Sequence, residues 1–146
     1  MAKLIFINLP VADLPRSIAF YSALGATQNL QFSDDTAACM VLSDTIHVML
    51  LTHGKYRQFT AKPIGDAHAA SHALIALSED SREAVDSAVA KAVEGGGVAD
   101  PGPVQDHGFM YGRSFEDPDG HHWEVFWMDT AAAAGAAAQP AATAGA

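Results

Sequence analysis

The chain has 146 residues and a formal net charge of −9, and 49% of its residues are hydrophobic. This length accommodates one domain with its own core, and no apolar run reaches the roughly 18 residues that a membrane-spanning helix needs. The 8 basic residues are dispersed along the chain, so no basic patch favours nucleic acid as a partner.

The first part of the chain predicts a β-α-β-β-β unit over about residues 3–52. Leu4–Leu9 is rich in β-branched and aromatic residues, which favours a buried strand. Asp13 is the expected N-cap of a helix over Leu14–Leu24, which Gly25 ends. Three strand-like segments follow, separated by short polar turns: Thr27–Phe32, Ala37–Leu42 and Ile46–Thr52.

The same order of elements returns over about residues 71–129, after a polar linker. Ala73–Leu77 is the expected first strand. Asp80 and Glu83 predict a capping box at the start of a helix that carries an apolar stripe. Three further strands are expected near Gly97–Ala99, Met110–Phe115 and His122–Met128. The repeated order predicts an α+β fold of two paired modules.

The domain boundaries and location follow from the rest of the composition. We expect one domain over residues 1–129 and a disordered, alanine-rich tail over residues 130–146. The single cysteine, Cys39, excludes an internal disulfide bond and fits a reducing cytoplasm. The chain enters strand-like sequence directly and shows no signal peptide, so we expect a cytoplasmic protein.

The segment Asp117–Trp127 is the most informative one, because a Pro-Asp-Gly turn leads directly into a strand with one carboxylate. The alternation places Trp123 and Trp127 on one face, which suits packing against helices. Glu124 points to the opposite face. There it is a ligand, a base, or a carboxylate paired with a neighbour, for which Arg113 on the adjacent predicted strand is the natural candidate.

Two segments carry a family pattern: Asn8–Tyr21 followed by Leu24-Gly25, and Phe115–Gly120 followed by Trp123-Glu124-Val125. Together they resemble the vicinal oxygen chelate superfamily, which includes glyoxalases, bleomycin and fosfomycin resistance proteins and extradiol dioxygenases. The pattern is closest to small bacterial proteins predicted to be lactoylglutathione lyases. The resemblance implies paired modules whose strands curl around a cup for a small molecule. It also implies a homodimer, because members commonly complete or brace their cups across subunits.

The resemblance further implies where metal-dependent members hold a divalent ion, which is at four positions in the first and last strands of the two modules. These positions fall on Phe6, Leu50, Leu74 and Glu124. Phe and Leu side chains offer no lone pair, and a lone carboxylate does not hold a transition metal against water. We therefore expect the usual metal site to be missing and no cofactor to be needed.

A displaced site for a divalent metal is an alternative. His72 and His122 are expected on the face of Glu124, and the three would form a set of two histidines and one carboxylate. The reading that we favour places both histidines at strand ends, partly solvated. His47 is expected on the face opposite Leu50, outside the cup.

Other polar residues are candidates for ligand binding. Asn8 places an amide near the floor of the cup, where it either orients a ligand or satisfies backbone groups. Tyr111 and Arg113 share one strand face, and they either offer a hydroxyl and a cation to an anionic ligand or form a surface salt bridge. Lys55–Thr60 would lie across the cup mouth or against a partner subunit. His121 falls in a predicted loop and is expected to be solvent-exposed.

Two classes of function remain open. The first is a metal-independent binder of a small polar or anionic metabolite or drug, with Glu124, Asn8 and Arg113 as polar anchors. The second is a lyase or isomerase of lactoylglutathione lyase type, with Glu124 as base or ligand and a relocated metal or Arg113 stabilising an enolate. The residues at the ligand positions favour the first class, and the resemblance to predicted lyases favours the second.

Overall fold

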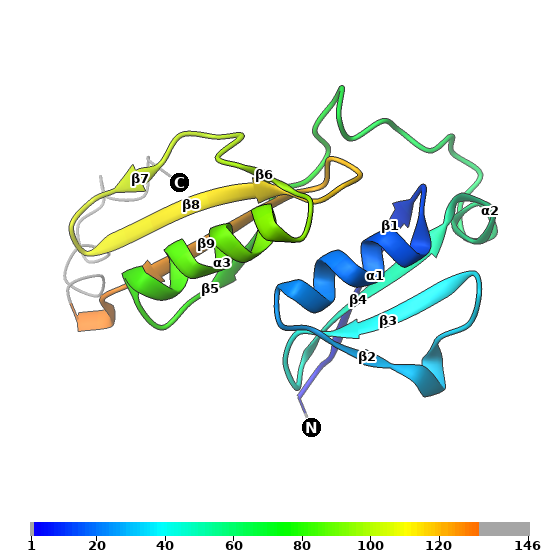
Figure 1. The fold of residues 1–146 in the computed structure, drawn as a ribbon, viewed down its shortest axis with the longest axis horizontal. Coiled ribbons are helices and arrows are strands. Elements are labelled where there is room, and N and C mark those ends of the chain that lie inside the picture. Colours follow the sequence, from blue (N-terminus) through cyan, green and yellow to red (C-terminus); the bar gives the residue numbers. More distant parts are fainter. Residues whose placement is uncertain (1, 132–146) are drawn as a thin grey trace.

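The structure, a computed structural model, describes residues 2–131 (Figure 1). From residue 132 onward, the predicted disordered tail lies outside the described residues. The chain forms strands and helices in this order: β1 (Ile5–Val11), α1 (Leu14–Ala23), β2 (Thr27–Asn29), β3 (Ala37–Val41), β4 (Ile46–Thr52), α2 (His53–Tyr56), β5 (Ile75–Ser78), α3 (Arg82–Glu94), β6 (Val98–Ala99), β7 (Gln105–Asp106), β8 (Met110–Glu116) and β9 (His122–Met128).

The first module is a four-stranded sheet in the order β1-β4-β3-β2, with α1 on one face (Figure 1). Strand β1 runs parallel to β4, and the other pairs are antiparallel. Helix α1 begins where predicted, because the Asp13 carboxylate accepts a hydrogen bond from the backbone N–H of Arg16. The expected strand Thr27–Phe32 ends at Asn29, whose side chain caps the short 3₁₀ helix Leu30–Phe32.

The second module repeats this order in the sheet β5-β9-β8-β6, to which β7 adds a short pairing with β8. Helix α3 packs on β8 and β9. Its N-cap is Ser81 rather than Asp80, because the Ser81 hydroxyl accepts from the Ala84 N–H at 3.0 Å. Strand β5 starts at Ile75, two residues after the predicted start. The predicted α+β fold of two paired β-α-β-β-β modules is confirmed.

One hydrophobic core joins the two modules. Helix α1 reaches the second sheet through Phe20, 6.1 Å from the ring of Phe115, and through Tyr21, 5.9 Å from that of Trp123. Trp123 and Val125 are each 1% exposed, so the predicted core face of β9 is confirmed. The face of each sheet that is turned away from this core is called its open face below.

The strands form two sheets, and β1 and β5 are edge strands. Within the described residues, β1 pairs with β4 alone and β5 with β9 alone. None of the helices in residues 2–131 combines the length and the apolar character needed to cross a membrane.

Candidate functional site

The register of the first sheet decides which side chains reach its open face. Leu9 lies opposite Leu50, and Asn8 lies opposite Met49. Leu50 is fully buried in the core, while Phe6 is 48% exposed. The expectation that Leu50 shares the face of Phe6 is therefore wrong, because an offset of one residue turns a side chain to the other face of a strand.

The internal repeat shows which residue of the first module corresponds to Glu124. Asn8 and Ala76 each lie five residues before the N-cap of the next helix, Asp13 and Ser81 respectively. Ala76 lies opposite Glu124 in the second sheet, as Asn8 lies opposite Met49 in the first. Met49, and not Leu50, is thus the counterpart of Glu124.

His47 lies two residues before Met49, as His122 lies two residues before Glu124. His47 is therefore the counterpart of His122, and it lies on the open face of the first sheet. Its ring stacks on Phe6, with 4.5 Å between centroids and 19° between planes. The expectation that His47 lies outside this face is wrong. The His47 Nδ1 atom is buried and has no hydrogen-bond partner among the described residues.

The open face of the first sheet carries a cleft of about 280 Å³, lined by Asn8, Leu51, Tyr56, Phe59 and Thr60. Asn8 donates from Nδ2 to the Phe6 carbonyl at 3.2 Å, and no described residue donates to its amide oxygen. The linker segment Lys55–Thr60 therefore lies over the first open face, where its aromatic rings form one wall of the cleft.

On the open face of the second sheet, Glu124 is partly buried between Ala76 on β5 and Ser114 on β8. No described residue forms a hydrogen bond or salt bridge with its carboxylate. Arg113 is not its partner, because the register places Ser114 opposite Glu124 and turns Arg113 to the other face. Leu74, just before β5, is 59% exposed.

The two histidines of the alternative metal set differ in their exposure. His72 is exposed in the segment before β5, and His122 opens β9. The His122 Nε2 atom is buried without a hydrogen-bond partner in the described part of the chain, next to Gly102.

Tyr111 and Arg113 are occupied on the helix side of the second sheet. The Tyr111 hydroxyl donates to Asp86 of α3 at 2.7 Å. Arg113 donates to Asp100 at 2.6 and 3.1 Å and to Asp86 at 3.1 Å. These bonds lower the pKa of both carboxyl groups. At Asp86 the hydrogen bond from Tyr111 is the largest cause and the one from Arg113 comes second. At Asp100 the hydrogen bond from Arg113 is the largest cause. The alternative that places Tyr111 and Arg113 in the cup is therefore wrong, and the salt-bridge alternative is the one that the structure shows, with Asp86 and Asp100 as the partners of Arg113.

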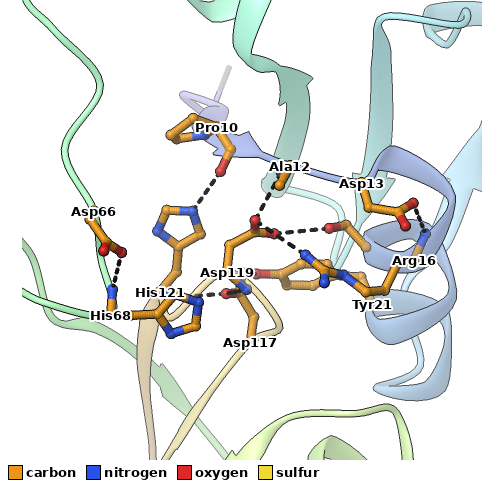
Figure 2. Close-up of polar contacts among 11 residues, drawn as sticks. Pro10, Ala12, Asp13, Arg16, Tyr21, Asp66, His68, Asp117, Asp119 and His121 are labelled. Carbon is orange, nitrogen blue, oxygen red and sulfur yellow. Dashed lines mark hydrogen bonds and ion pairs between the residues drawn. The ribbon is translucent and has the colours of Figure 1, made fainter.

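The Pro-Asp-Gly turn joins the two modules (Figure 2). Asp117 is 2% exposed and accepts hydrogen bonds from the Tyr21 hydroxyl at 2.6 Å and from the N–H groups of Asp119 and His121, both at 2.9 Å. Trp123 donates from Nε1 to the Tyr21 oxygen at 3.0 Å. Burial raises the pKa of both Asp117 and Tyr21, and the Asp117 charge raises that of Tyr21 further.

The same turn also binds the start of α1 (Figure 2). Asp119 accepts from the Ala12 N–H at 2.9 Å, from the Ser17 hydroxyl at 3.2 Å and from Arg16 at 3.4 Å. His121 contacts the Pro10 carbonyl through Nε2 at 2.8 Å, so its expected solvent exposure is wrong. The two segments that carry the family pattern thus contact each other, and together they form the joint between the modules.

The residues at the four expected ligand positions do not fit a divalent metal. With Met49 in place of Leu50, the set is Phe6, Met49, Leu74 and Glu124, in which only Glu124 offers an oxygen. No three His, Cys, Asp or Glu side chains within residues 2–131 form a group that could hold a metal ion. The alternative set of His72, His122 and Glu124 is therefore not assembled within the described chain.

The two β-α-β-β-β modules with a shared core are the arrangement that the sequence resemblance implies. The chain belongs to the Glyoxalase/Bleomycin resistance protein/Dioxygenase superfamily, whose family model matches residues 3–125. A comparison with curated proteins finds no match. The closer resemblance to lactoylglutathione lyases stays a prediction.

Solved structures share this fold. Hypothetical protein SA1046 from S. aureus is 28% identical with a TM-score of 0.71, over 87% of this chain and 94% of its own. A glyoxalase/bleomycin resistance protein/dioxygenase family enzyme from Burkholderia phytofirmans PsJN is 20% identical with a TM-score of 0.70, over 87% of this chain and 99% of its own. The fosfomycin resistance protein FosX from Listeria monocytogenes is 21% identical with a TM-score of 0.61, over 87% of this chain and 91% of its own.

Proposed function

We propose that the protein binds a small polar or anionic organic molecule, a metabolite or a drug, on the open faces of its sheets. Glu124 carries this proposal. Its carboxylate is partly buried on a sheet face and has no partner among the described residues, although removing a charged group from water is unfavourable unless it is paired. A hydroxyl or N–H group of a ligand would supply the missing donor.

The first open face offers the complementary surface. Its cleft combines the rings of Tyr56 and Phe59 with the free amide oxygen of Asn8. Lys55 lies 5.7 Å from the Phe59 ring centroid, where it can attract an anionic group. Apolar walls with a few polar groups are typical of small-molecule sites.

A homodimer is part of the proposal, because the edge strands leave apolar side chains uncovered. Leu4, Ile5 and Phe6 of the β1 region are 53%, 52% and 48% exposed, and Leu74 beside β5 is 59% exposed. Uncovered apolar edges are typical of surfaces that pair with another chain. A second copy would cover them and bring the first open face of one subunit towards the second open face of its partner.

Calorimetric titration of the full chain with fosfomycin, bleomycin and the glutathione hemithioacetal of methylglyoxal tests the proposal. We expect saturable binding of at least one compound, and about tenfold or greater weakening in Glu124→Gln, because a hydrogen bond to a charged group is lost. Glu94→Gln, at the exposed end of α3, is the matched control and should bind as the wild type does. Unchanged affinity in Glu124→Gln would contradict the proposal.

A lyase or isomerase is the second candidate, because a partly buried carboxylate without a partner also suits a general base. For that function, hemithioacetal turnover should fall about 100-fold or more in Glu124→Gln. Turnover that survives this substitution excludes Glu124 as the base. Elemental analysis after purification without a chelating tag separates the candidates, since one equivalent of transition metal, lost in Glu124→Ala, would contradict a metal-independent binder.

A further inference from the structure

A second candidate binding site lies just beyond the C-terminal end of α1, whereas Asp119 binds the N-terminal end of this helix. There the modules leave a groove of about 200 Å³ between the end of α1, the turn between β3 and β4, and the end of β5. Both modules contribute to its walls. The groove lies on the helix side of the molecule and shares no residue with the cleft of the first open face or with Glu124.

The groove has an apolar body. Leu24, Leu42 and Leu77 are half-buried on its walls, and the buried side chains of Phe115 and Val125 form its floor. Its volume is below the range of about 300 to 1,000 Å³ that holds drug-sized ligands. A ligand of this groove is therefore compact, and burial of its apolar part would contribute to binding.

The polar part of the groove is electronegative. Glu79 is its one charged lining residue, and no described residue forms a hydrogen bond or salt bridge with the Glu79 carboxylate. The C-terminal end of α1, where the helix dipole is negative, has no basic residue in its last turn. Ser43 and Ser78 are the other lining residues with polar side chains.

The environment of Glu79 favours an added cation. Burial raises the pKa of its carboxyl, and the neighbouring charge of Asp80 raises it further. Lys91 of α3 offsets part of this effect through space, without a salt bridge. A bound positive charge would remove the cost of holding the Glu79 carboxylate ionised in partly apolar surroundings.

We propose that this groove binds a compact organic ammonium ion, with the ammonium group on Glu79 and the apolar body between Leu24, Leu42 and Leu77. The site is independent of the function proposed for the open faces. It would serve as a second ligand site.

Titration of ¹⁵N-labelled full chain with benzylammonium, followed by amide chemical shifts, tests this site. We expect saturable shifts at Leu42, Leu77 and Ala88, and weaker or no response to the neutral isostere benzyl alcohol. Glu79→Gln should weaken benzylammonium binding about tenfold or more, because it removes the charge of the acceptor. Glu94→Gln, which keeps the same net charge as Glu79→Gln but lies outside the groove, should not weaken it.

Ala88→Leu is a second variant, which fills the groove without changing its charge. It should weaken benzylammonium binding even if Glu79→Gln fails to fold. Equal affinity for benzylammonium and benzyl alcohol, or shifts confined to the open faces, would overturn the proposal. Groove resonances that move with protein concentration and not with benzylammonium would also overturn it, since a second copy would then be the occupant. Glu124→Gln should leave these shifts intact, which separates this test from that of the proposed function.

Discussion

Asp117 and Glu124 belong to one motif, but the fold uses the two carboxylates in opposite ways. Asp117 is buried and accepts three hydrogen bonds from the protein. Glu124 lies partly buried on an open face without a partner among the described residues. A carboxylate whose acceptors are filled by protein donors stabilises the fold, whereas one without a donor is available to a ligand. The comparison separates the structural part of the family pattern from its candidate functional part.

The largest effect is expected from Asp117→Ala. The substitution leaves the Tyr21 hydroxyl and two backbone N–H groups without their acceptor in the joint. Because a buried unsatisfied donor costs about 1 to 3 kcal/mol, the free energy of unfolding should fall by about 3 kcal/mol or more. Urea unfolding followed by tryptophan fluorescence measures it. A loss below about 1 kcal/mol would mean that the joint does not hold the modules together.

A smaller loss is expected from Gly120→Ala in the same turn. Gly120 has φ of 89°, a backbone conformation that is strained for alanine, and an added Cβ would lie 2.7 Å from the backbone nitrogen of His68. Backbone strain and a steric clash would therefore both lower the free energy of unfolding. Gly25→Ala is the matched control, because Gly25 has φ of 104° with no atom within 4 Å of an added Cβ. We expect about 1 kcal/mol for Gly25→Ala and at least about 2 kcal/mol for Gly120→Ala by urea unfolding. Equal losses of unfolding free energy in the two variants would show that the linker segment at Ala67 and His68 does not pack on Gly120.

A third carboxylate, Asp106, lies between the two extremes, because it is exposed but paired. Arg82 donates to it at 2.8 and 3.0 Å, which lowers the pKa of Asp106 to about 2. Because the folded-state pKa is depressed, the pair stabilises the fold above the unfolded value of about 3.9 and loses its effect as pH falls towards about 2. The difference in urea midpoint between wild type and Asp106→Asn should therefore shrink between pH 5 and pH 2. A constant difference over this interval would contradict the pairing.

The faces of β9 and the start of α1 could be predicted from sequence, because their signals are local. Trp123 and Val125 alternate with Glu124, and Asp13 is a strong capping residue. The face of Leu50 is predicted wrongly, because this residue lies within a continuous apolar run that shows no alternation. Only the pairing register resolves such a strand.

The role of the Asp117–Gly120 turn could not be predicted from its neighbours in sequence. The hydrogen bond between Tyr21 and Asp117 joins residues 96 positions apart. A local pattern identifies the turn but not the helix that it binds. The same limit applies to Arg113, whose partners Asp86 and Asp100 come from α3 and a loop rather than from the adjacent strand.

The free energy of unfolding of Glu124→Gln tests the central comparison most directly. The substitution removes the charge, keeps the shape, and breaks no interaction within the described residues. We predict a change within about 0.5 kcal/mol of wild type, or a small gain, because an unpaired carboxylate is removed from a partly buried position. A loss of about 2 kcal/mol or more, comparable to that of the joint variants, would show that Glu124 is a structural residue and would contradict the account.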